Sequence, residues 1–117
     1  KVYMSNLCQE ITLPTTPIKH IDDPDGEIAL CILSAVNVGK IYKLSEMEEL
    51  CDLSVRSLEE LIDYQKYPVV AAERSTKARR SLGVGFIGLA HYLARNAEHY
   101  DDQGSWNLVH ELAEAFQ

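Results

Sequence analysis

The longest regular pattern in this sequence is a helical stripe of apolar side chains between residues 45 and 67. Its members recur at spacings of three and four residues: Met47, Leu50, Cys51, Leu58, Leu61 and Ile62. Ser45 followed by Glu48 forms a capping box, which is typical of a helix start. Pro68 disfavours helical geometry in the residue before it. The spacing therefore predicts one long helix that ends near Tyr67.

Shorter patterns surround this helix and indicate the fold class. Apolar runs predict strands over residues 27–33 and 81–87, the second preceded by a polar, basic stretch over 73–80. Helical spacing then predicts helices over 89–97 and 105–117, with Ser105 as the cap of the last one. Strands that alternate with helices are typical of α/β architecture.

Residues 4–13 precede Pro14 and offer too few positions for a stable helix, so we expect an extended segment. Side chains alternate in an extended chain, which places Asn6, Cys8 and Glu10 on one side. A cysteine between an amide and a carboxylate can serve as a nucleophile or a radical carrier, with the carboxylate as general base. The commoner arrangement with this spacing is a polar strand face with an inert thiol.

The composition excludes several classes of protein. The 117 residues, 46% of them hydrophobic, suffice for one domain with a modest core. A formal net charge of -7 gives no field that would attract a nucleic-acid polymer. The sequence has no run near the roughly 18 apolar residues of a membrane span. The three cysteines form neither a disulfide framework nor a zinc pattern, and they fit a reducing cytoplasm.

Other conspicuous residues have a structural explanation from sequence alone. Lys77, Arg79 and Arg80 could meet a phosphate or an acidic partner, but such a run is more often a solvated face. Cys51 lies on the apolar stripe and is expected to pack in the core, and Cys31 at the end of an apolar run has the same default interpretation. The histidines lack metal-ligand spacing. Because the chain stops inside an apolar-periodic pattern, we expect an excerpt of a longer protein.

Several separate strings together resemble a known family. Ser-Asn-Leu-Cys-Gln-Glu-Ile with Leu-Pro-Thr after it, and Gly-Glu-Ile-Ala-Leu-Cys beginning at Gly26, resemble the active-site region of class I (Ia-like) ribonucleoside-diphosphate reductase large subunits. The resemblance continues through Asp63-Tyr-Gln and Tyr67-Pro to Arg79-Arg-Ser-Leu-Gly-Val-Gly. It covers essentially the whole chain.

The resemblance implies a role for each matched residue. Cys8 matches the thiyl-radical cysteine that takes the 3′ hydrogen of the substrate ribose. Glu10 matches the carboxylate that takes the 3′-hydroxyl proton, and Asn6 matches the amide that bonds the substrate. Cys31 matches one of the two thiols that reduce the 2′ position and become a disulfide, and its partner thiol would lie outside this segment.

The resemblance also implies the setting of these residues. The fold would be a fragment of a ten-stranded α/β barrel, and a barrel cannot close from so few strands, so the isolated chain should be inactive. No cofactor or metal would be bound by this segment. The radical would come from a diiron-tyrosyl centre in a small (beta) subunit, and thioredoxin or glutaredoxin would supply the dithiol. The remainder of the large subunit would complete the enzyme, and two large subunits would form a homodimer.

Two other functions stay open at this point. A non-catalytic α/β scaffold or interaction module could retain a reductase sequence, and a parent protein without a second cysteine able to reach Cys31 would favour it. A simple thiol oxidoreductase is less favoured because the sequence has no Cys-x-x-Cys.

Overall fold

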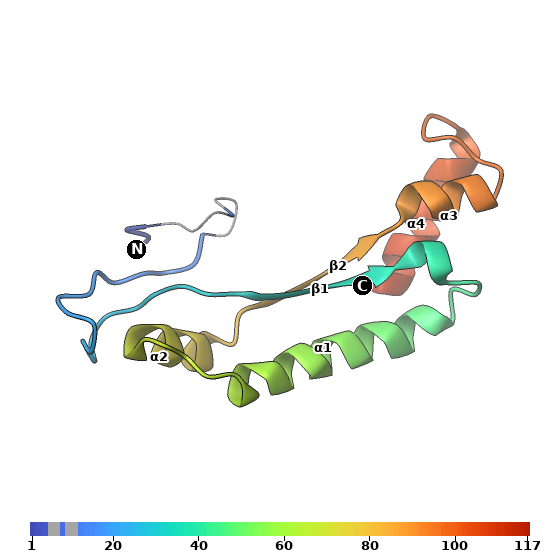
Figure 1. The fold of residues 1–117 in the computed structure, drawn as a ribbon. Coiled ribbons are helices and arrows are strands. Elements are labelled where there is room, and N and C mark those ends of the chain that lie inside the picture. The colour runs from blue at the N-terminus through green and yellow to red at the C-terminus, as the bar shows by residue number, and fades with distance from the viewer. Residues whose placement is uncertain (5–7, 9–11) are drawn as a thin grey trace. The chain divides into compact units, whose positions relative to one another are not determined.

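A computed structural model describes residues 1–4, 8 and 12–117 of the chain. Among these residues the order is β1 (Ile32–Asn37), a 3-10 helix η1 (Val38–Lys40), α1 (Glu46–Tyr64), α2 (Val70–Arg79), β2 (Leu82–Ile87), α3 (Leu89–Arg95) and α4 (Gln103–Phe116) (Figure 1). Each strand in this order is followed by helices. The predicted α/β class is therefore confirmed.

β1 and β2 pair with each other in a two-stranded sheet. Figure 1 shows their arrows pointing the same way, and the chain between them forms α1 and α2. Parallel neighbours need such a helical crossover, so this is a βαβ unit. The first strand was expected over 27–33, and this prediction was wrong: the strand begins at Ile32. Glu27 and Ile28 direct their backbone hydrogen bonds to Thr16 and to α2 instead.

The contacts divide the chain into two compact units, one of residues 1–32 and 58–83, the other of residues 33–57 and 84–117. In the first unit, Leu58 and Ile62 from α1 are buried, as are Ala71 and Ala72 from α2. This unit contains both cysteines that were predicted to be functional, Cys8 and Cys31.

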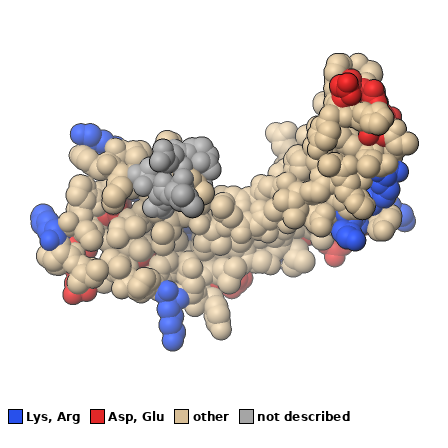
Figure 2. Space-filling view, turned by 45° about the horizontal axis from the view of Figure 1, so that its top comes forward, with Lys and Arg blue, Asp and Glu red and all other residues tan. Residues whose placement is uncertain are grey.

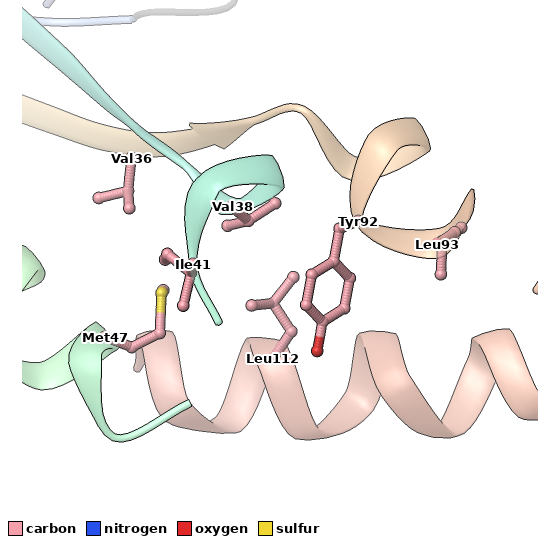
Figure 3. Packing of buried hydrophobic residues seen from close by; sticks show 7 residues of the cluster. All are labelled: Val36, Val38, Ile41, Met47, Tyr92, Leu93 and Leu112. Atoms are coloured by element: carbon pink, nitrogen blue, oxygen red, sulfur yellow. The ribbon is translucent and has the colours of Figure 1, made fainter. Parts of the chain in front are cut away.

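The second unit contains a cluster of buried apolar side chains. Figure 3 shows its seven members: Val36, Val38, Ile41, Met47, Tyr92, Leu93 and Leu112. They come from β1, from η1 and the residue that follows it, from the start of α1, and from the helices α3 and α4. Arg95 supports this core from its edge, because its guanidinium donates a hydrogen bond of 3.0 Å to the Gly39 carbonyl and lies over the Tyr42 ring. Met47 belongs to the apolar stripe that predicted α1, so part of that stripe packs in this cluster.

Three helix ends differ by two residues or more from the sequence-based expectation, and one of them is the end of α3, at Arg95 instead of residue 97. α1 ends at Tyr64, three residues before Tyr67, because the Tyr67 hydroxyl donates to the Ile62 carbonyl and satisfies a terminal acceptor of the helix. α4 begins at Gln103, so Ser105 lies inside it and is not its cap. The Ser105 hydroxyl instead donates to the Asp102 carbonyl at 2.7 Å. Side-chain bonding back to the previous turn competes with capping.

α2 is a helix that the apolar pattern did not predict. Its buried face consists of small residues only: Ala71, Ala72, Ser75 and Thr76. These positions are spaced as one face of a helix, but they carry too little apolar surface to form a recognisable stripe. No helix in the described part of the chain combines the length and the apolar content that a membrane span needs.

Candidate active site

Cys8 is the only described residue of the predicted Asn6, Cys8 and Glu10 group. Its side chain is half-buried and lies outside any helix or strand. The thiol is free, so the structure has no Cys8–Cys31 disulfide. Asn6 and Glu10 lie outside the described residues, and so does most of the segment that was predicted to be extended. The shared face of these three side chains therefore stays a prediction.

Thr15 holds together the two ends of the segment that carries Cys8. The backbone N–H groups of Tyr3 and Met4 donate to the Thr15 hydroxyl oxygen at 2.8 and 3.3 Å. The Thr15 N–H in turn donates to the Lys1 carbonyl at 3.2 Å. These bonds join residues before Cys8 to residues after it. Thr15 therefore ties together described residues on the two sides of Cys8, and we call this junction the base of the Cys8 loop.

Thr16 and Glu27 form an antiparallel bridge next to this loop base. The Thr16 N–H donates to the Glu27 carbonyl at 3.0 Å, and the Glu27 N–H donates to the Thr16 carbonyl at 2.9 Å. The Thr16 hydroxyl also donates to Glu27 Oε2 at 3.0 Å. That hydrogen bond, with the neighbouring Arg79 guanidinium, lowers the pKa of the Glu27 carboxyl below its ordinary value. Glu27 therefore stays ionised at neutral pH.

The segment from Glu27 to Cys31 lies against α2. The Ile28 N–H donates to the Ala71 carbonyl at 3.3 Å, and the Ser75 hydroxyl donates to the Ile28 carbonyl at 2.7 Å. At the other end of the segment, the Ile32 N–H donates to the Ser81 carbonyl at 3.3 Å. Cys31 is half-buried between these anchors, immediately before β1. Its backbone position is therefore fixed on both sides.

The basic run at the end of α2 is occupied by ion pairs within the chain. Arg79 Nη2 lies 2.6 Å from Glu27 Oε1, and Lys77 Nζ lies 2.7 Å from a carboxylate of its own helix. Arg80 has a left-handed backbone and binds the α1 carboxylates of Glu59 and Asp63. Hydrogen bonds to Asp63 and then Glu59 raise the pKa of Arg80, and the Arg80 guanidinium lowers the pKa of Asp63. The run thus joins elements of the first unit.

Cys51 behaves as the apolar stripe predicted. It is half-buried and packs against the core cluster of the second unit, and burial raises the pKa of its thiol. A thiol held in its neutral form is a poor nucleophile. Among the residues that the structure describes, no group of three or more His, Cys, Asp and Glu side chains could hold a metal ion.

Charge does not gather into one field on the face shown in Figure 2. Basic and acidic side chains are scattered there among uncharged residues. The net charge of the sequence, -7, has the wrong sign for steering a phosphate backbone.

Sequence reasoning missed the residues that hold the two thiol segments. Thr15, Thr16 and Glu27 lie inside or beside the motif strings, which assign them no role of their own. The sequence signal that could have identified them is a polar side chain near each cysteine: the hydroxyls of Thr15 and Thr16 follow Cys8, and the carboxylate of Glu27 precedes Cys31. Ser75 had no such signal, because its partner is 47 residues away.

Comparisons with known proteins agree with the motifs. The family model for the ribonucleotide reductase barrel domain matches residues 1–117. The chain is 60% identical over 116 residues to the ribonucleoside-diphosphate reductase subunit alpha of Haemophilus influenzae, and 54% identical to that of Buchnera aphidicola subsp. Schizaphis graminum. It is 52% identical to ribonucleoside-diphosphate reductase 1 subunit alpha of Escherichia coli (strain K12).

Each of these alignments covers 99% of this chain but only 15% of the relative. The chain thus spans about 15% of the length of the curated relatives it matches, all of it inside the barrel-domain match. The resemblance seen in the motif strings is confirmed over the full sequence. This chain belongs to the ribonucleotide reductase barrel-domain family.

Proposed function

We propose that this chain is part of the catalytic subunit that reduces ribonucleoside diphosphates to 2′-deoxyribonucleoside diphosphates. The observation that carries the proposal is the match of the barrel-domain model to all 117 residues, with relatives named as reductase alpha subunits at up to 60% identity. The activity belongs to the complete subunit, because the chain corresponds to 15% of those relatives.

The first steps of the proposed reaction use the loop that carries Cys8. Cys8, as a thiyl radical, takes the 3′ hydrogen atom of the ribose and becomes a thiol. Glu10 accepts the proton of the 3′-hydroxyl group, which eases departure of the 2′ oxygen, and Asn6 orients the sugar by hydrogen bonding. About 1 Å of misplacement can cost on the order of a hundredfold in rate. The closed base at Thr15 supports this assignment, because such a loop must be held in place.

The later steps use Cys31 with a second thiol from outside this chain. The 2′-hydroxyl group leaves as water, the two thiols supply two hydrogen atoms, and their sulfurs join in a disulfide. The ribonucleotide and a dithiol are thereby converted into a deoxyribonucleotide, a disulfide and water. Glu10 returns the proton to the 3′ oxygen, and Cys8 then returns the 3′ hydrogen atom. Cys31 suits this role structurally because its segment is anchored on α2 and on Ser81.

The proposal includes the partners that the complete enzyme needs. A small (beta) subunit with a diiron-tyrosyl centre would supply the radical. Thioredoxin or glutaredoxin would reduce the disulfide after each turnover. The remainder of the large subunit would complete the barrel, and two such subunits would form a homodimer. A cytoplasmic location suits a cycle that depends on reduced thiols.

Substitution of Cys8 in the full-length subunit tests the proposal. Cys8→Ser should abolish deoxynucleotide formation, measured with the radical-supplying subunit and an external dithiol, because the O–H bond of serine is too strong for its hydroxyl to form a radical in place of the thiol. Cys31→Ser should abolish steady-state turnover. Cys51→Ala is the matched control and should retain activity, because Cys51 packs in the core. Retained activity in Cys8→Ser would end the proposal.

A further inference from the structure

One carboxylate joins the two segments that carry the proposed functional thiols. Glu27 Oε2 accepts the hydroxyl of Thr16 at 3.0 Å, and Glu27 Oε1 accepts the guanidinium of Arg79 at 2.6 Å. The two oxygens thus bind two different parts of the first unit: the segment after the Cys8 loop, and the end of α2. A single side chain holds both.

The connection from Glu27 to Cys8 is short along the chain. Thr16 directly follows Thr15, whose hydroxyl closes the base of the Cys8 loop. The Thr16–Glu27 bridge adds two backbone hydrogen bonds of 2.9 and 3.0 Å. Any shift of the Glu27 segment relative to Thr16 would therefore be transmitted to the loop base.

The connection from Glu27 to Cys31 is shorter still. Cys31 lies four residues after Glu27, and Ile28 between them bonds to Ser75 on α2. The Arg79–Glu27 pair is half-buried, with 33% and 21% of the two side chains exposed. Partial burial reduces screening by salt, so this pair constrains geometry more than an exposed pair does.

We propose that Glu27 is a positioning residue that sets the separation of Cys8 from Cys31 in the reductase reaction. This inference rests on the proposed function. Cys8 and Cys31 would act on neighbouring carbons of one ribose, so their separation must suit both steps. Glu27 acts through its hydrogen bonds with Thr16 and Arg79.

Side-chain chemistry predicts how substitutions at this site rank. Glu27→Ala removes both acceptors. Thr16→Val removes the hydroxyl donor but keeps the shape of the side chain, and Thr16→Ser keeps the donor. Glu73→Gln is the matched control, because Glu73 forms an exposed ion pair with Lys77 on the same helix as Arg79.

The test uses the full-length subunit with its radical-supplying subunit. The enzyme is fully reduced beforehand, and no external dithiol is added, so turnover is limited to the thiols that the subunit itself holds. The amplitude of deoxynucleotide formation counts competent sites, and the rate constant reports how well the thiols are aligned. We expect Glu27→Ala and Thr16→Val to lower the rate constant at least about tenfold with the amplitude unchanged. Thr16→Ser and Glu73→Gln should stay within about twofold of the parent rate.

The possible outcomes separate this inference from the proposed function. A parental rate constant in both Glu27→Ala and Thr16→Val, with Cys8→Ser inactive, would overturn the inference and leave the function standing. A lower amplitude at an unchanged rate constant would also overturn it, since Glu27 would then only maintain folding. If Glu27→Ala fails to fold, the rate constants of Thr16→Val and Thr16→Ser are compared instead. A slower Thr16→Val supports the inference, and equal rate constants overturn it. Activity in Cys8→Ser would instead overturn the function itself.

Discussion

Replacing Thr15 with valine removes one oxygen atom and leaves the shape of the side chain almost unchanged. That oxygen accepts the N–H groups of Tyr3 and Met4, which precede Cys8, while Thr15 follows it. Only 9% of Thr15 is exposed, so the hydroxyl is not easily replaced by water. The substitution should therefore loosen the base of the Cys8 loop without creating a cavity.

The size of the effect follows from the two distances. The bond from Tyr3, at 2.8 Å, has an ordinary length, whereas the bond from Met4, at 3.3 Å, is longer than most N–H···O bonds. We therefore count one lost bond. An unsatisfied donor costs about 1–3 kcal/mol, and we take the lower end because the Tyr3 residue is 57% exposed. A cost of about 1 kcal/mol corresponds to roughly fivefold more frequent opening of the loop.

Hydrogen exchange in the full-length subunit measures this opening. The Tyr3 amide should exchange about fivefold faster in Thr15→Val than in the parent protein. Thr15→Ser keeps the hydroxyl group and should exchange at nearly the parental rate. Equal exchange in Thr15→Val and the parent would show that the hydroxyl does not close the loop. Equally fast exchange in both variants would assign the effect to the lost methyl group.

Three further predictions concern the core, a half-buried thiol and the isolated chain. Leu112→Ala should lower the free energy of opening of α4, measured by hydrogen exchange, by about 3 kcal/mol, because Leu112 is fully buried. Leu112→Met should lower it by less than about 1.5 kcal/mol, and equal losses in the two variants would refute the packing. The alkylation rate of Cys51, followed against pH, should reach its midpoint above the ordinary thiol pKa of about 8.5, because burial raises the pKa of this thiol. The stability that the neutral thiol contributes is fully present below the ordinary pKa and is lost as pH rises through the raised pKa. A midpoint at or below about 8.5 would contradict the burial. The 117-residue chain alone should form no deoxynucleotide with a radical-supplying subunit and a dithiol, and measurable turnover would show otherwise.

Local patterns determined several parts of this molecule. The apolar stripe that includes Met47, Leu58 and Ile62 is read from neighbours along one helix, and those residues are buried in the structure. The family could also be read from sequence, because its motif strings are contiguous and occur in order. Each of these features depends on residues within a few positions of one another, which is the range that periodicity and motifs report.

Other features depended on contacts between distant parts of the chain. Residues 27–33 have the composition of a strand, but Glu27 and Ile28 use their backbone groups on Thr16 and α2, so the strand starts at Ile32. α2 itself buries only small side chains, which leave no apolar stripe to read.

The placement of Glu27 between Thr16 and Arg79 was likewise decided by the tertiary structure, because Arg79 is 52 residues from Glu27. A carboxylate in a sequence shows its charge but not its partner. Which oxygen binds which donor is set only when the chain has folded and the two segments lie side by side.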